Sequence, residues 1–506
     1  VLFTLLFFAA TKIVPHINHH NESLNKPFGA FRKLTLDWSP RSIITLWCLV
    51  TAFWIPYFVA YFPGVYWYDT SWQLMEYYDP SVPFTDHHPF MMTYLYVGFA
   101  HIGKALFNNA TYGLYLLVLV QTLLSTLAIA CTVCYTGKYN ILWKCRFFIA
   151  VFLTFFPIIP MMSMSLAKDT FNTPFFVFFS IAFCELWRTQ GTILKSVSFD
   201  VFFIADALAV SLTKKTGMYI IVLALLLLAC FVVKHWSYKI ATIVLGGVPY
   251  LVVGIIAPTF ILPAWHIAPG ESNEILAVPM QQVANVVHNH KDDLSIAEID
   301  EIQQIYHMDI GQLQDAYCWY KADPIKGQEL SSKDEHALIT TWTKQLVKHP
   351  GDMIAGWGGL SVAWFSFNVA SGEEQDLSMM RPINNSKHHY QNIEQYMPWT
   401  DNTKAGNAIG QFYADTLSAT PILNIIWQKA FWATILPFAI MFLILRSKKN
   451  KLNLLILNLP MFITMLVLFA GPISTHTEAT RYVLPMLYII PLFLSLTLKH
   501  LQPEES

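Results

Sequence analysis

Long apolar segments recur along most of this sequence, and they constrain its fold more than any other feature. Segments of roughly 17 to 24 mostly apolar residues can cross about 30 Å of hydrocarbon as helices. They lie near residues 42–62, 112–135, 147–166, 170–187, 197–213, 217–233, 240–262, 423–445, 452–470 and 482–499, and residues 1–14 look like a truncated further one. The sequence therefore predicts an all-α polytopic membrane protein with about eleven transmembrane helices. Because the first residue is Val1 and already apolar, we expect a fragment that lacks its true start.

The overall composition agrees with a membrane protein. Of 506 residues, 55% are hydrophobic and only 13% charged, whereas a soluble protein of this size carries about 25% charged residues. The net charge is -1 and no basic cluster resembles a nucleic-acid footprint, so we expect no nucleic-acid partner. Most of the seven cysteines fall in apolar segments, and they predict no disulfide framework.

Lysines and arginines predict the orientation, since positive residues favour the cytoplasmic ends of spans. The expected cytoplasmic set is Arg32, Lys33, Arg41, Lys138, Lys144, Arg146, Arg188, Lys195, Lys234, Lys239, Arg446, Lys448, Lys449, Lys451, Lys499 and His500. Counting residues 90–107 as a span would break this pattern. We therefore expect that stretch, with His101 and Lys104 in its second half, to be an interfacial or re-entrant helix.

The predicted topology divides the chain into three parts. Residues 1–262 form a transmembrane module with a first outer loop at 63–111, residues 263–420 an extracytoplasmic, mainly helical region, and residues 421–506 the last transmembrane helices. Within 263–420, Ser295 and Glu298 have capping-box spacing, residues 356–368 are apolar but short and predict an interfacial dip, and residues 372–410 resemble loop. No internal repeat is visible.

Ionisable residues gather at the predicted outer ends of the spans, where their desolvation calls for water, partners or a substrate. They are Asp69, Asp86, His87, His88, Lys168, Asp169, Lys214, Lys215, Glu478 and Arg481. A transferase acting on a lipid phosphate needs a carboxylate to deprotonate the acceptor hydroxyl and cations to hold the departing phosphate. This set offers both.

Each residue of the set also has a plainer interpretation. Asp69 is either a base or a helix cap. Asp86, His87 and His88 could bind a divalent metal or hydrogen-bond a phosphate, Lys168 and Asp169 could simply pair with each other, and Glu478 could pair with Arg481 on one helical turn. Lys214 and Lys215 precede Gly217, which suits either a phosphate site or a solvated turn.

Together, the loop from Asp69 to the His-His-Pro at 87–89, Asp169, the Lys-Thr-Gly at 215–217 and the Glu-Ala-Thr-Arg-Tyr at 478–482 resemble the GT-C superfamily of integral-membrane glycosyltransferases. The layout is similar to the protein mannosyltransferase and aminoarabinose transferase type of bacteria. The resemblance implies a polyprenyl-phosphate sugar donor, inverting transfer on the outer face, and Asp69 as general base. It also implies that His88 matches part of a His-Pro-Pro element and that Lys215 and Arg481 lie near the donor phosphate. Two positions depart from the family pattern, since Thr70 replaces the second acid and Phe90 the second proline.

The resulting hypothesis is a multi-pass plasma-membrane glycosyltransferase with an extracytoplasmic active site. It would transfer one sugar to a glycan, teichoic acid or protein acceptor, with Lys214, Lys168 and His88 assisting at the phosphate and with membrane lipid as its surroundings. No cofactor is required by the sequence, although a divalent metal remains an alternative. Two other classes stay open: an envelope polysaccharide polymerase or ligase, and a transporter of lipid-linked intermediates.

Overall fold

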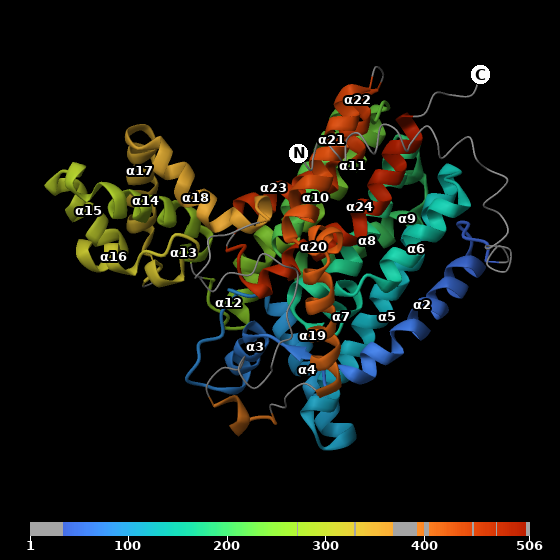
Figure 1. The fold of residues 1–506 in the computed structure, drawn as a ribbon, viewed down its shortest axis with the longest axis horizontal. Coiled ribbons are helices and arrows are strands. Elements are labelled where there is room, and N and C mark those ends of the chain that lie inside the picture. Colours follow the sequence, from blue (N-terminus) through green and yellow to red (C-terminus); the bar gives the residue numbers. More distant parts are fainter. Residues whose placement is uncertain are drawn as a thin grey trace.

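The computed structural model describes residues 34–270, 272–327, 330–367, 392–398, 404–447, 450–471 and 473–501. The predicted segment 1–14 and the basic residues Arg32, Lys33, Lys448 and Lys449 lie outside these ranges. In the described chain the regular secondary structure is helical apart from one two-stranded ladder and isolated bridges (Figure 1).

The N-terminal half is a series of helices that pack into a bundle (Figure 1). These are α2 (Pro40–Ala60), α3 (Tyr68–Tyr78), α4 (Phe90–Phe107), α5 (Ala110–Thr136), α6 (Trp143–Phe155), α7 (Ile158–Ser163), α8 (Lys168–Thr189), α9 (Val197–Thr213), α10 (Thr216–Phe231), α11 (Trp236–Pro249), a π-helical stretch (Tyr250–Ile261) and α12 (Leu262–Ala264). Short 3₁₀ turns follow α5 at Gly137–Tyr139 and α8 at Thr192–Lys195.

The C-terminal helices complete this bundle. They are α19 (Lys404–Ala419), α20 (Pro421–Ile426), a π-helical turn (Phe431–Ile435), α21 (Leu436–Arg446), α22 (Lys451–Leu457), α23 (Leu459–Ala470), a 3₁₀ turn (Thr477–Ala479) and α24 (Thr480–Leu501). α24 packs against α5 and α8, so the end of the chain lies beside its first half.

Five described helices are long and apolar enough to cross a membrane. They span Pro40–Ala60, Ala110–Tyr139, Lys168–Thr189, Trp236–Ala264 and Thr480–Leu501, and a sixth arises if α22 and α23, bent by 66°, count as one span. The chain is thus an α-helical membrane protein, while the predicted total of eleven spans is not confirmed. Two of the expected spans, α10 and Phe431–Arg446, are shorter apolar helices.

Two predicted segment boundaries are wrong. The expected continuous span at 147–166 is broken, because α6 ends at Phe155 and α7 begins at Ile158 after Pro157, which cannot continue a helix from the preceding residue. The expected loop at 372–410 becomes helical at its end, where α19 begins at Lys404. Most of the remainder of that loop lies outside the described residues.

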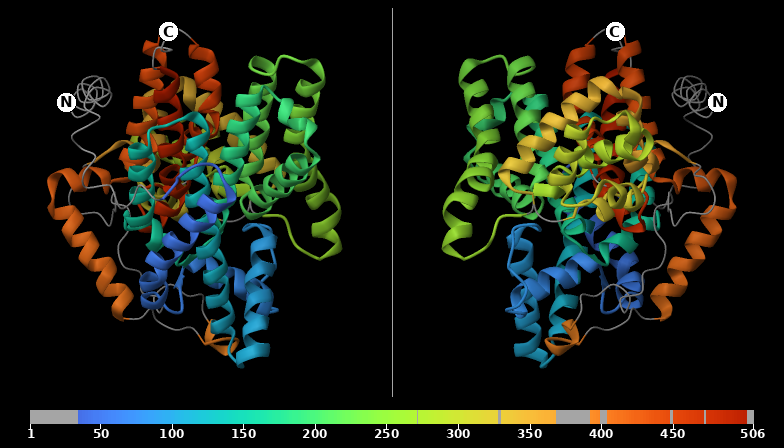
Figure 2. Two further views of the ribbon diagram at one scale, coloured as in Figure 1. Left: turned by 90° about the vertical axis from the view of Figure 1, so that its right-hand side faces the viewer. Right: turned by 90° about the vertical axis from the view of Figure 1, so that its left-hand side faces the viewer.

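The predicted helical region forms a unit with its own core beside the bundle (Figures 1 and 2). Its helices are α13 (Ser272–Ile275), α14 (Ala277–His290), α15 (Ile296–Tyr306), α16 (Ile310–Ala316), α17 (Ser332–Lys348) and α18 (Pro350–Phe365), with 3₁₀ turns at Lys291–Asp293 and Asp323–Ile325. A further 3₁₀ turn at Ile393–Gln395 packs near α3. The core includes Met280, Val283 and Leu338, all fully buried.

Local sequence signals explain the ends of these helices. The Ser295 hydroxyl accepts from the Glu298 amide and the Glu298 carboxylate accepts from the Ser295 amide, which confirms the predicted capping box. α17 ends before Pro350, which is the first residue of α18. α18 then leads back to the bundle, where its Trp364 is buried in the main core; the predicted interfacial dip of this segment stays a prediction.

Candidate functional site

A short parallel ladder brings two distant loops together. β1 (Val65–Tyr66) pairs with β2 (Ser165–Leu166), with Val65 opposite Ser165. Directly after the ladder, one strand enters α3 and the other enters α8. Asp69 and Asp169 are each the second residue of their helix, so the pairing places two carboxylates side by side at two helix N-termini, where the helix dipole stabilises negative charge.

The helix starts are built in the same way. The Thr70 hydroxyl accepts from the Trp67 amide at 3.3 Å, and the Thr170 hydroxyl accepts from the Ala167 amide at 3.2 Å. Each threonine also donates back to a carbonyl of β2. The Asp-Thr at 69–70 and at 169–170 is therefore a short structural repeat that sequence inspection missed, and Asp69 is not the helix cap considered as an alternative.

Arg481, at the start of α24, joins the two carboxylates. Its Nη2 lies 2.6 Å from Oδ2 of Asp69 and its Nε lies 3.4 Å from Oδ2 of Asp169. Lys214 approaches Asp169 from the end of α9, with its Nζ 2.5 Å from Oδ1. The side chain of Asp169 is fully buried and that of Arg481 is 6% exposed, so these charges lie away from bulk water.

A second pair of contacts holds the His-His-Pro loop against this cluster. Lys168 Nζ lies 2.7 Å from Nδ1 of His88, and Lys215 Nζ lies 2.7 Å from Oδ2 of Asp86. The ring of His87 packs edge-on against that of His88. Lys168 thus contacts His88, and the ion pairs of Asp169 are with Lys214 and Arg481, so the mutual Lys168–Asp169 pair considered from the sequence is not formed.

The electrostatics follow from these contacts. Burial is the largest single influence on Asp69 and opposes its charge, but Arg481, His88 and Lys168 together outweigh burial and hold the pKa of this carboxyl below its usual range. Burial and the positive charge of Lys168 lower the pKa of His88 well below its usual value, so the ring is neutral and Nδ1 can accept from Lys168. Burial raises the pKa of Glu478 while the nearby Arg481 opposes this rise.

Two tyrosines join the site without having been expected from the sequence. The Tyr482 hydroxyl lies 3.1 Å from Nη2 of Arg481, and its ring lies under Lys214 Nζ at 5.3 Å from the centroid. Tyr96 of α4 is 1% exposed, and burial together with the charge of Asp69 raises its pKa. Tyr482 directly follows Arg481 and was quoted only as part of a motif, whereas Tyr96 lies in an apolar helix and has no local signal.

The cluster also contains nitrogen atoms with unused hydrogen-bonding capacity. Nη1 of Arg481 is buried without a hydrogen-bond partner in the described chain. Within that same part of the chain, no ion pair joins Lys168 to a carboxylate. A buried guanidinium and a neighbouring ammonium with spare donors are suited to an anion such as a phosphate.

A metal at Asp86, His87 and His88 is not favoured by the geometry. Oδ2 of Asp86 pairs with Lys215 and Nδ1 of His88 contacts Lys168, so each of these two side chains already has a lysine as its partner. In the described ranges, one group of three or more potential ligands lies close enough to hold a metal, and it is His290, Asp293 and His349 of the helical region.

Comparison with known proteins gives one match. A family of unknown function, DUF6020, matches residues 77–506. The chain belongs to this family. No curated protein and no solved structure matches it. The DUF6020 match includes His88, Lys168, Asp169, Lys214 and Arg481, while Asp69 lies just before its start.

Proposed function

We propose that this chain is a GT-C type glycosyltransferase of the bacterial plasma membrane, acting on the extracytoplasmic side. It would transfer a sugar from a polyprenyl-phosphate donor to a cell-envelope acceptor: a glycan, a teichoic acid or a protein. The observation that carries the proposal is the convergence of Asp69, Asp169 and Arg481 from three distant segments at the helix ends. These residues, with Lys168, Lys214 and His88 beside them, are called the Asp69 cluster below.

The position of the cluster supports a lipid-linked substrate. α8 starts with Lys168 and Asp169 and carries Arg188 in its last turn, and its 22 residues cover roughly 33 Å, about the thickness of a bilayer core. At its far end Glu185 pairs with Lys138 at 3.1 Å and with Arg188 at 2.5 Å. The turns after α5 and α8 carry Lys138 and Lys195, Arg188 precedes the second of them, and positive residues favour the cytoplasmic side. The Asp69 cluster would then lie at the opposite surface, at the level of the lipid headgroups.

The proposed reaction forms a bond between the acceptor oxygen and the anomeric carbon of the sugar, and it breaks the bond from that carbon to the phosphate oxygen. The hydroxyl proton goes to Asp69, and polyprenyl phosphate leaves with the bonding electrons. Arg481 and Lys168 would hold the phosphate, with Lys215 and His88 near it. Charge-assisted donors directed at a developing phosphate charge are a strong source of transition-state stabilisation.

The ion pair between Asp69 and Arg481 suggests how the base becomes active. A carboxylate whose pKa is held low is a weak base, and catalytic bases work best with a pKa near the operating pH. A donor phosphate that engages Arg481 would weaken the ion pair and raise the pKa of Asp69. In this scheme donor binding itself prepares the base.

The test is a donor-turnover assay on purified protein in nanodiscs. Release of polyprenyl phosphate is followed for a panel of polyprenyl-phosphate sugars, with envelope acceptors and with or without divalent metal. Wild type should turn over one donor, and Asp69→Asn should lose about 100-fold or more, the typical range for removal of a positioned general base. The matched control is Asp315→Asn, on the exposed surface of α16, which should retain full activity.

Two results would count against the proposal. Wild type that turns over no donor under any of these conditions would favour the polymerase or transporter alternatives. If Asp69→Asn is as active as wild type, the protein is a transferase in which another residue acts as the base. Addition of many units from a lipid-linked donor, in place of transfer of one sugar, would identify the polymerase class in the same assay.

A further inference from the structure

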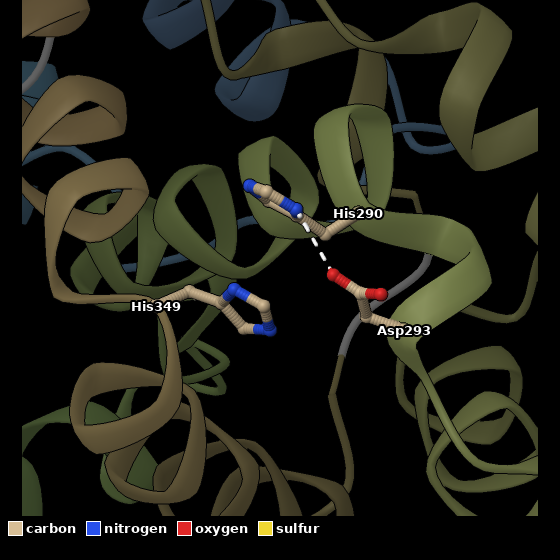
Figure 3. A group of neighbouring side chains, drawn as sticks. All are labelled: His290, Asp293 and His349. Atoms are coloured by element: carbon tan, nitrogen blue, oxygen red, sulfur yellow. Dashed lines mark hydrogen bonds and ion pairs between the residues drawn. The ribbon is translucent and has the colours of Figure 1, made fainter.

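Two histidines and an aspartate of the helical region face one another at the junction of three segments. His290 ends α14, Asp293 closes the following 3₁₀ turn, and His349 lies between α17 and α18 (Figure 3). One ring nitrogen of each histidine and one carboxylate oxygen of Asp293 lie within 4.8 Å of each other. Nδ1 of His290 lies 3.2 Å from Oδ2 of Asp293.

A second carboxylate orients the ring of His290. Nε2 of His290 lies 3.0 Å from Oδ2 of Asp352, and the other oxygen of Asp352 accepts from the Asn289 amide at 2.8 Å. A histidine that binds a metal through one nitrogen almost always donates its other N–H to a carboxylate, carbonyl or water. Asp352 stands in that supporting position, and because its 3.0 Å contact is shorter than the 3.2 Å contact to Asp293, it favours the tautomer of neutral His290 with the proton on Nε2.

With that tautomer, a cation is required between His290 and Asp293. With the proton on Nε2, the lone pair of His290 Nδ1 faces an oxygen of Asp293 at 3.2 Å, and two acceptors at this distance repel each other unless a proton or metal ion lies between them. A proton alone would satisfy His290. It would leave His349 unexplained, because Nε2 of His349 is sheltered from solvent and has no hydrogen-bond partner in the described chain.

A metal ion would satisfy both histidines. The rings of His290 and His349 lie 4.6 Å apart between centroids with an interplanar angle of 26°. Ligand atoms around a tetrahedral zinc, at about 2.0 to 2.2 Å from the ion, are roughly 3.4 Å apart. The ligand atoms of the three residues now lie within 4.8 Å of one another, so the side chains would have to rotate toward this separation when the ion binds.

We infer that His290, Asp293 and His349 form a binding site for a divalent transition metal of the zinc class. Two imidazoles and a carboxylate are a donor set that zinc favours, with a water or one further ligand in the fourth position. The ion would tie the end of α14 to the α17–α18 junction. Lys348 already bridges these segments, since its Nζ donates to the Asp293 carbonyl at 2.7 Å. The site is separate from the Asp69 cluster and does not depend on the proposed transferase reaction.

The experiment measures metal binding directly, on full-length protein purified with a tag that contains no histidine. After treatment with EDTA, the protein is titrated with Zn²⁺ against a chromophoric chelator, and bound metal is counted by mass spectrometry. Wild type should bind one Zn²⁺ per chain. His290→Ala and His349→Ala should each weaken binding at least 100-fold, and Asp352→Asn should weaken it 10- to 100-fold, the usual effect of removing a supporting carboxylate.

The control is His336→Ala, an exposed histidine of α17 outside the group, which should bind Zn²⁺ like wild type. Co²⁺ supplies a readout that does not depend on folding of a variant, because a tetrahedral site shows characteristic visible absorption in the wild-type protein. Two results would overturn the inference. One is that both histidine variants still bind one Zn²⁺ per chain, and the other is that wild type binds neither Zn²⁺ nor Co²⁺. The latter result would leave His290 as a hydrogen-bonded bridge between Asp293 and Asp352.

Discussion

At the scale of single residues, the candidate site is a network of charged side chains around the buried Asp169 and Arg481, in which each group depends on its neighbours. The fully buried Asp169 is compensated by Lys214 at 2.5 Å and by Arg481 at 3.4 Å. Removing one partner of a buried pair leaves an uncompensated charge, which is far more costly than losing an exposed pair. The network therefore has consequences for stability that are independent of any reaction.

Lys214→Met should destabilise the protein by about 3 to 5 kcal/mol, because it leaves Asp169 with a more distant cation only. Thermal unfolding in detergent would show this as a lowered midpoint, and Lys214→Met/Asp169→Asn should recover part of the loss. The matched control is Lys344→Met, whose pair with Glu301 is 3.2 Å long and whose side chain is 53% exposed; it should change stability little. Equal midpoints for both single variants would contradict the buried-pair description.

Glu76 of α3 should make stability depend on pH. Its side chain accepts from the Thr85 hydroxyl at 2.6 Å, and burial raises its pKa from 4.5 to about 7. Because the folded state holds the proton more tightly, the stabilisation by the neutral carboxyl is complete below pH 4.5 and is lost as pH rises from 4.5 to about 7. The total is roughly 3 kcal/mol.

Glu76→Gln removes the titration while keeping a side chain of similar size. Relative to wild type, this variant should therefore gain stability as pH rises from 4.5 to 8, as measured by thermal midpoints at each pH. A difference between the two proteins that stays constant over this range would show that Glu76 does not titrate with a raised pKa.

At the scale of elements, α4 and α5 form a tightly packed hairpin. A Cβ on Gly113 would collide with the Phe99 carbonyl and the Gly103 amide, so the two backbones cross at these glycines. Small residues permit this kind of close approach between helices in a membrane. The crossing matters for the site because α4 supplies Tyr96 and follows the loop that holds His88.

Gly113→Ala should therefore separate the helices and lower the thermal midpoint, whereas Gly98→Ala on the same hairpin should be tolerated, since a Cβ at Gly98 meets no atom within 4 Å. If the transferase proposal holds, Gly113→Ala should also reduce donor turnover, because the His88 loop would shift. Equal stability of the two alanine variants would mean that the hairpin is not packed as described.

At the scale of the whole molecule, the helices separate two groups of charges. Both α8 and α24 begin in the Asp69 cluster and end near the basic turns, where Trp187 and Tyr139 contact His500. The loop after α3 and the turn after α8 should therefore lie on opposite faces of the membrane.

Cysteine labelling would test this arrangement in a variant without native cysteines. Ser81→Cys, in the exposed loop after α3, should react with an impermeant maleimide in intact cells, whereas Thr192→Cys, in the exposed turn after α8, should react only after permeabilisation. Labelling of both positions from the same side would overturn the predicted orientation.

Most residues of the Asp69 cluster can be identified from the sequence, because a charged side chain at the end of an apolar segment is recognisable without a structure. Asp69, His88, Lys168, Asp169, Lys214 and Arg481 were found in this way. The sequence did not predict which of these residues contact one another. Arg481 lies some 300 residues from Asp169, and local spacing favoured the adjacent Lys168–Asp169 pair instead.

The sequence by itself determined the helical membrane class, the capping of α15 and the candidate charges, since apolar length, cap spacing and unfavourable burial of charge act locally along the chain. Only the tertiary structure decided that β1 and β2 align two aspartates, that Arg481 bridges them, and that His290, Asp293 and His349 meet. These arrangements depend on packing between distant helices, which sets side-chain distances that no local pattern encodes.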